Sequence, residues 1–495
     1  MFQDESLDVV SFESNWQQQR SVKDSQTQTS EIINYDAEVQ VVTYSNAQVQ
    51  AEEEETQFQL IADQSENLMQ FLRYATPLIC EELDKNSKSH AFDGYDVNWE
   101  EKAEAIECLH TLSYAEVNDK LQCTDLSWNA IGSVIAVAYG KLDHQDWCTD
   151  KSVLCTWNID RHNIISSKPD TVIEVSCCLT SIDFHPERIS MIAGGVFNGE
   201  VQVWDISRED EMLIARSGIS DDSHQEPVTS IKWINDPNIK SKALQLMSSA
   251  TDGKIFVWQI NMQNQDFQLT KGFVVVTDNI PKSLRISKAK DNAEIGVTGF
   301  SFSNEDKSLF VIGCESGNVF KCSLNSERNA VTGLNSIPLF SPVTFAFHYH
   351  DGPVYSIECS PYHRNLFLTC GMDTSAHLYT ILQSKPILSF EPGNGFMFNI
   401  KWSPVRPMVF ATSTAEGSLL IYDLEISKIN PVINLAVNDN KSPVYSLQFN
   451  KQRRQLLATG DGNGKIQIWR LNDELTNQKT RETHHLAELA EVALE

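Results

Sequence analysis

The sequence lacks the features that mark membrane proteins and nucleic-acid-binding proteins. No apolar run approaches the roughly 18 residues that a membrane-spanning helix needs. The first residues, Met1–Ser6, are acidic and precede no apolar signal core, so we expect no signal peptide. Basic residues are few, because 39 Lys and Arg stand against 67 Asp and Glu and give a net charge of −28. Such a chain repels phosphate, so we predict an intracellular protein that binds neither nucleic acid nor an anionic membrane.

The cysteines lack a familiar metal-binding or disulfide pattern. There are 11 of them, they never form C-x-x-C, and Cys177 and Cys178 are adjacent. This spacing suits neither a zinc knuckle nor a disulfide framework. We therefore expect reduced and mostly buried thiols, as is typical of intracellular proteins.

Catalytic motifs are also missing. Gly460–Lys465 looks like a phosphate-binding loop, but it lacks the first Gly of G-x-x-x-x-G-K, and Ile466 stands where Ser or Thr would hold the metal. His348–His350 and His484–His485 have no metal-ligating companions nearby in the sequence, so we interpret them as surface or turn histidines. No Ser/His/Asp group can be argued from spacing. The sequence predicts a protein that is not an enzyme and has no cofactor or metal.

A turn followed by a strand that ends in a large residue recurs along most of the chain. It is clearest at Asn198–Asp205, where Asn-Gly is followed by alternating small and β-branched residues and then Trp204. The residues that close the copies are 43 to 64 positions apart, about the period of a propeller blade or slightly more. The other copies are Ser152–Trp157, Asp252–Trp258, Ser316–Cys322, Asp373–Tyr379, Glu416–Tyr422 and Asn463–Trp469.

Each copy is preceded by a strand in which apolar and polar residues alternate, such as Val228–Trp233, and by a second strand of small residues, such as Met191–Gly195. Four short strands per repeat predict an all-β fold, a seven-bladed WD-repeat β-propeller over residues 115–472. A linker (89–114) would precede it, and a tail (473–495) with a possible short helix would follow. The strand that closes the ring could come from Val97–Trp99 or from the tail, and the sequence does not decide between them.

The first 62 residues predict a disordered acidic arm. They are rich in Gln, Ser, Glu and Asp, and residues 1–110 hold 23 acidic and 6 basic residues, so −17 of the net charge lies there. Three pieces of the arm place Gln between Thr, Val or Ala, as in peptides that add to the open edge of a partner sheet. The alternative is a polar linker with chance Gln spacing. The residues concerned are Thr27, Gln28, Thr29, Val39, Gln40, Val41, Val49 and Gln50.

Residues 63–88 predict an amphipathic helix. Apolar residues recur there largely at steps of three and four, while Pro77 interrupts the pattern. Either a second helix begins at Pro77 and runs to residue 86, or one helix is kinked. The apolar face would lie in a partner's groove or pack back on the propeller. That face consists of Leu68, Phe71, Leu72, Ala75, Ile79 and Leu83.

The order of these parts, together with Phe71–Arg73, Glu82–Asn86 and especially Ser89–Trp99, resembles the dynein intermediate chains, and among them those of the intraflagellar-transport dynein. The resemblance covers essentially the whole chain. It implies that Thr27–Thr29 binds a light chain that reads TQT peptides, although Ser25 and Gln26 separate this core from Lys23, the nearest basic residue. It also implies that the helix receives a roadblock-type light chain and that the propeller binds the dynein heavy chain.

The resemblance implies a non-catalytic subunit of the cytoplasmic dynein 2 complex. Such a subunit would link light chains to the heavy chain beside a second intermediate chain, and would serve retrograde intraflagellar transport and cilium assembly in the cytoplasm, the cytoskeleton and the cilium. The alternative is a WD-repeat substrate receptor of a ubiquitin ligase. Receptors of that kind often close a blade with Trp-Asp-x-Arg, whereas here Trp204–Ile206 is followed by Ser207 and Arg208 comes one place late.

Overall fold

The structure is a computed structural model of the 495-residue chain. It describes residues 62–87, 105–114, 121–144, 148, 151–161, 164–235, 244–261, 266–279, 293–330 and 337–492. The chain divides into two units, Met1–Val97 and Asn98–Glu495.

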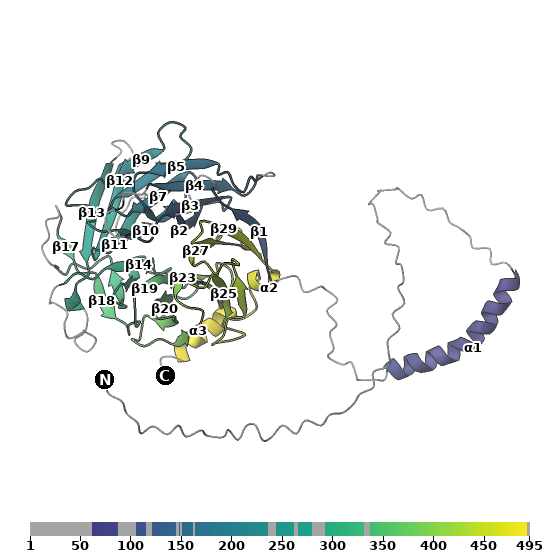
Figure 1. Cartoon of the computed structure of the whole chain (residues 1–495). Helices are drawn as coiled ribbons and strands as arrows, with labels where there is room; N and C mark the ends of the chain where they lie inside the picture. The colour runs from purple at the N-terminus through teal and green to yellow at the C-terminus, as the bar shows by residue number, and fades with distance from the viewer. Residues whose placement is uncertain are drawn as a thin grey trace, which may run out of the picture. The chain divides into compact units, whose positions relative to one another are not determined.

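The described part of the first unit is one helix. It is α1 (Ala62–Ser87), which has 26 residues and continues through Pro77 (Figure 1). The predicted helix is thus confirmed as a single helix, and no second helix begins at Pro77. An internal Pro removes one backbone hydrogen bond and typically costs about 3 kcal/mol, so this helix is stabilised less by its own backbone than its length suggests.

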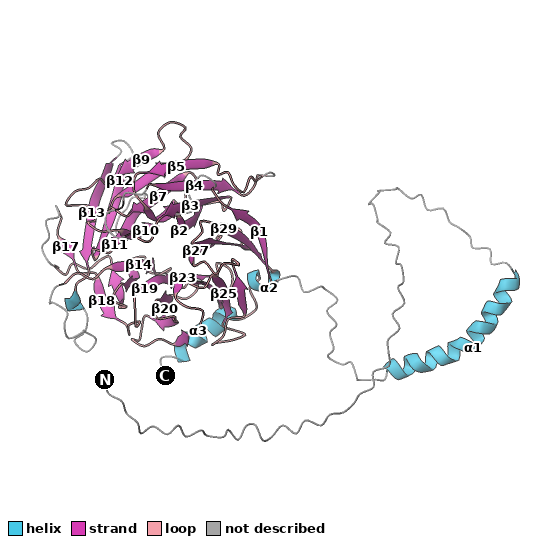
Figure 2. Cartoon of the chain, viewed as in Figure 1, coloured by secondary structure: helices cyan, strands magenta, loops and turns pink. Residues whose placement is uncertain are grey.

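Strands dominate the second unit, as Figure 2 shows. Within the described residues they form seven blades, so the predicted seven-bladed WD-repeat propeller is confirmed. Blade 1 contains β2 (Gln122–Trp128), β3 (Val134–Gly140), β4 (Ser152–Asn158) and β5 (Thr171–Val175). Blade 2 contains β6 (Leu179–Phe184), β7 (Met191–Val196), β8 (Val201–Asp205) and β9 (Leu213–Arg216).

The next three blades include the stretches with the longest repeat spacing. Blade 3 contains β10 (Val228–Ile234), β11 (Gln245–Ala250), β12 (Lys254–Asn261) and β13 (Asp266–Val274). The short strand β17 (Leu339–Phe340) pairs with β13, and the 3-10 helix η2 (Thr277–Asn279) follows β13 along the chain. Blade 4 contains β14 (Val297–Phe302), β15 (Leu309–Cys314), β16 (Val319–Ser323) and β18 (Val343–Ala346). Blade 5 contains β19 (Val354–Cys359), β20 (Leu366–Gly371), β21 (Ala376–Thr380) and β22 (Leu388–Phe390).

The ring closes in the last blade. Blade 6 contains β23 (Met397–Trp402), β24 (Val409–Thr414), β25 (Ser418–Asp423) and β26 (Ile433–Ala436). Blade 7 contains β27 (Val444–Phe449), β28 (Leu456–Asp461) and β29 (Ile466–Leu471), and its outer strand is β1 (Ile106–Leu112), antiparallel to β29. The closing strand therefore comes from neither of the two segments that the sequence suggested. It lies in residues 89–114, which the sequence analysis treated as a linker.

The apolar cores lie between neighbouring blades. Seven clusters of buried side chains fill the seven junctions, from the one between blades 1 and 2 to the one between blades 7 and 1. The first strands of successive blades (β2, β6, β10, β14, β19, β23 and β27) contact one another in a closed ring around the centre (Figure 1). Each blade thus relies on both neighbours to bury its faces, and a seventh blade lacking β1 would leave one junction incomplete.

The tail beyond the last blade belongs to this packing. It forms α2 (Asp473–Thr476) and α3 (Glu482–Val492), and Leu486 and Ala490 of α3 are buried in the core between blades 5 and 6. No helix in the described part of the chain is long and apolar enough to cross a membrane.

Candidate partner-binding surfaces

The peptide motifs of the arm cannot be placed. Thr27–Thr29, Val39–Val41 and Val49–Gln50 lie outside the described residues. Their role stays a prediction from sequence.

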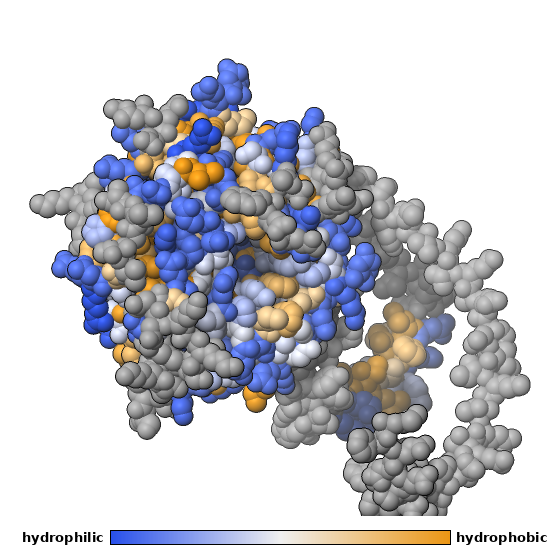
Figure 3. Space-filling model, turned by 60° about the vertical axis from the view of Figure 1, so that its left-hand side comes forward, coloured by the Kyte–Doolittle hydropathy of each residue, from blue (hydrophilic) through white to orange (hydrophobic). Residues whose placement is uncertain are grey.

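The apolar face predicted on α1 is present and open. Leu68, Phe71, Leu72, Ala75, Ile79 and Leu83 follow one another at helical steps, which places them on one side of the helix. Phe71 is 63%, Ile79 56% and Leu83 61% exposed, and Figure 3 shows apolar side chains at the surface of the helix. Ala75 alone on this face is buried, at 9% exposure.

The exposed ion pairs of α1 contribute less to its stability than burial of its apolar face would. Charged residues near its end pair with one another, since Lys85 Nζ lies 3.1 Å from Glu81 and 2.8 Å from Glu82. Exposed pairs of this kind stabilise a helix by only a few tenths of a kcal/mol. Burial of the apolar face would contribute far more, about 1.5–3 kcal/mol for each large side chain fully covered. Covering this face would therefore contribute more to stability than the exposed ion pairs do.

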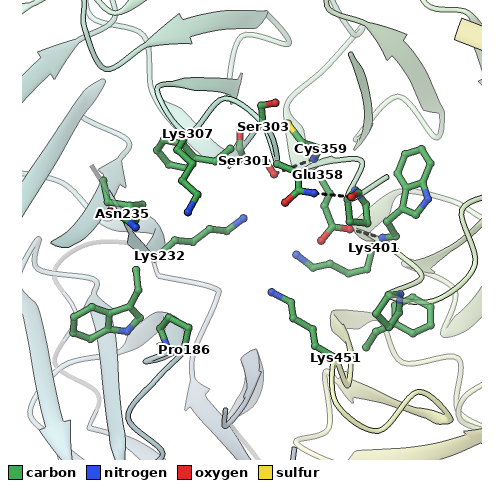
Figure 4. A pocket seen from close by; sticks show the side chains of 18 of the residues that line it. Pro186, Lys232, Asn235, Ser301, Ser303, Lys307, Glu358, Cys359, Lys401 and Lys451 are labelled. Atoms are coloured by element: carbon green, nitrogen blue, oxygen red, sulfur yellow. Dashed lines mark hydrogen bonds between the residues drawn. The ribbon is translucent and has the colours of Figure 1, made fainter. Parts of the chain in front are cut away.

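The propeller has a cavity at one mouth of its central channel. Its volume is about 690 Å³, and it is lined by residues at or just beyond the ends of inner strands from blades 2 to 7. Four lysines reach into it from four blades, as Figure 4 shows. They are Lys232 (blade 3), Lys307 (blade 4), Lys401 (blade 6) and Lys451 (blade 7).

The positive charge of this cavity is only partly balanced. Its carboxylate, Glu358, accepts a hydrogen bond from the backbone N–H of Trp402. Lys232 Nζ donates to the carbonyl of Phe300 at 3.0 Å. Burial and the charge of Lys401 together lower the pKa of Lys232 to about 8, while the carboxylates of Glu358 and Asp183 oppose the shift. In a chain with a net charge of −28, the four lysines form a local concentration of positive charge, which Asp183 offsets in part through its interactions with Lys232, Lys401 and Lys451.

This site is not predicted from the sequence, because its residues are spread from position 186 to position 451. A signal was nevertheless present. Lys232 and Lys401 occupy equivalent positions, each just before a Trp at or next to the end of an inner strand. Once the strands are aligned as blades, equivalent positions lie around one axis, and their charges meet.

Blade 3 carries a complete hydrogen-bond network between its strands. Nδ1 of His224 lies 3.4 Å from Oδ1 of Asp252, and its Nε2 lies 2.8 Å from Oγ of Ser248, which also accepts a 2.8 Å bond from Nε1 of Trp258. The His224 ring is fully buried. This network links the turn before β10 to β11 and β12, so it stabilises the blade and offers no group for chemistry.

Blade 5 repeats this arrangement around His350. Its Nδ1 lies 2.8 Å from Asp373 and its Nε2 lies 2.7 Å from Thr369 Oγ1. The interpretation of His350 as a surface or turn histidine was wrong, because its side chain is buried. His350, Asp373 and His377 are close enough together to be considered as metal ligands. Both ring nitrogens of His350 already have partners, however, so we assign this group to the stability of the blade.

Comparisons with known proteins are consistent with this architecture. Over 98% of its length the chain is 42% identical to "Cytoplasmic dynein 2 intermediate chain 2" of Mus musculus, of which the alignment covers 92%. It is 43% identical to the Homo sapiens protein of that name, over 86% of this chain and 79% of the relative. The chain belongs to the dynein intermediate chain family.

More distant dynein intermediate chains match a smaller share of the chain. Identity to "Dynein intermediate chain 3, ciliary" of Heliocidaris crassispina is 26% over 81% of this chain and 62% of the relative. The family model "Dynein axonemal intermediate chain 3 WD40 domain" matches residues 300–471, which hold most of blades 4 to 7. The model "WD domain, G-beta repeat" matches residues 218–259, where this intermediate chain has its complete His224 network.

Proposed function

We propose that this chain is a non-catalytic intermediate chain of the cytoplasmic dynein 2 motor, and that it links light chains to the heavy chain. Two relatives with that printed name are 42% and 43% identical to it over most of its length. The dynein names of the relatives favour this function over that of a ubiquitin-ligase receptor. Its place would then be the cytoskeleton and the cilium, in retrograde intraflagellar transport and cilium assembly.

The exposed face of α1 carries the proposal for one light chain. A helix that presents several large apolar side chains to solvent suits a hydrophobic groove, and we propose a roadblock-type light chain as its partner. The arm would hold the light chain that reads TQT peptides through Thr27, Gln28 and Thr29, with Val39–Val41 and Val49–Gln50 as weaker sites. Two weak peptides bound to a dimeric partner gain affinity from effective concentration.

The test for α1 uses two variants that add the same charge to opposite faces. Leu72→Asp lies on the apolar face, whereas Gln70→Asp lies on the other side and is exposed. The tagged full-length chain is purified from ciliated cells and its co-purifying proteins are quantified by mass spectrometry. We expect Leu72→Asp to lose the roadblock-type light chain and to keep the heavy chain, while Gln70→Asp keeps both. Equal recovery of this light chain with the two variants would contradict the assignment.

A third variant tests the arm, with Thr27, Gln28 and Thr29 all changed to Ala. It should lose the TQT-reading light chain alone. If ubiquitin-ligase components co-purify with the chain and no dynein subunit does, the motor function itself is refuted.

For the propeller we propose that the lysine cavity receives an acidic segment of a partner subunit in the motor. Lys307 and Lys451 are exposed, so changing both to Glu reverses the charge at the cavity without disturbing the core. Lys428→Glu is the control, an exposed lysine in the loop after β25 that does not line the cavity. We expect the double variant to recover at least tenfold less heavy chain or second intermediate chain than the control. Equal recovery would exclude the cavity as a docking site.

A further inference from the structure

Three metal-ligating side chains meet where blade 1 contacts blade 2. His144 and Cys148 lie in the connection between β3 and β4, and Cys178 directly precedes β6. The ligating atoms of the three residues all lie within 4.8 Å of one another. Zinc bound at about 2.3 Å to sulfur and 2.0–2.1 Å to nitrogen places its ligands roughly 3.5–3.8 Å apart, so small side-chain rotations would bring these atoms to bonding distance.

Both sulfurs accept hydrogen bonds from the backbone. The N–H of Cys178 donates to Sγ of Cys148 at 3.2 Å, and the N–H of Lys141 donates to Sγ of Cys178 at 3.3 Å. The two sulfurs are therefore already held by donors that a bound cation would complement.

The histidine brings a nitrogen that lacks a partner. Nε2 of His144 is buried and has no hydrogen-bond partner among the described residues. The ring is held in place, because it packs against Phe197 of blade 2 with 4.2 Å between ring centroids. This is the opposite of His350 in blade 5, where both nitrogens are engaged by Asp373 and Thr369. A buried polar nitrogen without a partner, next to two sulfurs, points to a ligand.

We propose that His144, Cys148 and Cys178 bind one Zn²⁺ ion. Two thiolates and an imidazole are the ligands that zinc takes in tetrahedral sites. Cys177 is the candidate for a fourth ligand, since it directly precedes Cys178 and its thiol donates to the carbonyl oxygen of Cys148 at 4.0 Å. Binding forms two zinc–sulfur bonds and one zinc–nitrogen bond, and the thiols of Cys148 and Cys178 each release one proton to the buffer. No electron is transferred.

The role of the ion is structural. It fastens the connection between β3 and β4, which belongs to blade 1, to the start of β6 in blade 2. The adjacent cysteines alone do not predict a metal site, because familiar zinc motifs place ligand pairs at a short spacing such as C-x-x-C. Here the ligands come from two connections about 30 residues apart, and only the propeller brings them together.

The test measures zinc in the full-length chain. The protein is purified under reducing conditions, dialysed against metal-free buffer and analysed by elemental mass spectrometry. We expect about one equivalent of zinc, reduced at least fivefold by His144→Ala and by Cys178→Ser. Cys108→Ser is the control, because it removes an exposed thiol from β1 in blade 7, and it should keep its zinc. Cobalt in place of zinc should give the visible absorption of tetrahedral cobalt–thiolate, and Cys178→Ser should lose it.

Melting curves separate loss of metal from loss of fold. Added zinc should raise the melting temperature of the wild-type chain and leave that of His144→Ala unchanged, while the two proteins melt together in chelator. His144 is only half-buried in a connecting loop, so its variant is expected to fold. The proposal is overturned if the wild-type chain holds no zinc, if both variants hold as much as the wild type, or if Cys148 and Cys178 form a disulfide in the protein purified under reducing conditions.

Discussion

Arg406 should be the residue whose loss releases the C-terminal helix. It lies in the turn between β23 and β24, and its side chain is 1% exposed. Its Nε donates to Glu482 Oε1 at 2.7 Å, and its Nη1 donates to the carbonyl of Glu474 at 2.9 Å. The same Nη1 lies 2.8 Å from Oδ2 of Asp423. One guanidinium therefore joins blade 6 to both α2 and α3.

The magnitude follows from the burial of the two carboxylates. Asp423 and Glu482 are 1% and 0% exposed, so Arg406→Leu would leave two buried negative charges without their cation. Breaking a buried pair by removing one partner costs about 3–5 kcal/mol. Lys479 Nζ lies 3.8 Å from Asp423 and compensates one carboxylate in part, which favours the lower end of that range.

Hydrogen exchange of the α3 amides is the appropriate assay, because it reports on the opening of this helix alone. The free energy of global unfolding would include all seven junctions between blades. A loss of about 3 kcal/mol should speed exchange in α3 at least 100-fold. Arg406→Leu combined with Glu482→Leu should exchange more slowly than Arg406→Leu alone, since one uncompensated charge is removed. The matched control is Arg453→Leu, which loses only an exposed pair with Asp160, worth about 0–1 kcal/mol.

If Arg406→Leu changes α3 exchange less than fivefold, or no more than Arg453→Leu does, the reasoning is refuted. The C-terminal helix would then be held by its apolar contacts, Leu486 and Ala490, rather than by the buried ion network.

Three further predictions concern the ring itself. A chain that begins at residue 115 lacks β1 and should be insoluble or aggregated by size-exclusion chromatography, whereas one that begins at residue 98 should be monodisperse; equal behaviour would show that β1 is dispensable. Ser248→Ala removes the hydroxyl that both His224 and Trp258 contact, and we expect a loss of about 2–4 kcal/mol in urea unfolding, with less than 1 kcal/mol arguing against a role for the network. Burial, together with the charge of His350, lowers the pKa of His377 from 6.5 to about 4. The unfolded chain therefore takes up this proton more readily than the folded chain. The contribution of His377 to the free energy of unfolding is fully present above pH 6.5 and falls by about 2–3 kcal/mol as the pH approaches 4.5. His377→Gln should flatten this part of the pH profile of urea unfolding, and an unchanged profile would contradict the assignment.

Much of the fold is visible in the sequence because its signals are local. Turn residues such as Asn198-Gly199, the alternation of β10 and the small residues of β7 each reflect a strand or turn within one blade. Their recurrence is sufficient to predict seven blades, since a blade cannot bury its faces alone and must repeat. The apolar face of α1 is equally local, because three- and four-residue steps place side chains together on any helix.

What joins distant segments was decided only by the tertiary structure. Neither the pairing of β1 with β29 nor the burial of Arg406 against Glu482 has a local pattern, because each partner alone looks like an ordinary strand or a surface charge. The lysine cavity and the group formed by His144, Cys148 and Cys178 arise in the same way. The sequence by itself determined the repeat, the strands and the apolar face of α1. Closing the repeats into a ring determined which charges, sulfurs and strand edges meet, because ring closure pairs residues as far apart as Ile106 and Leu471.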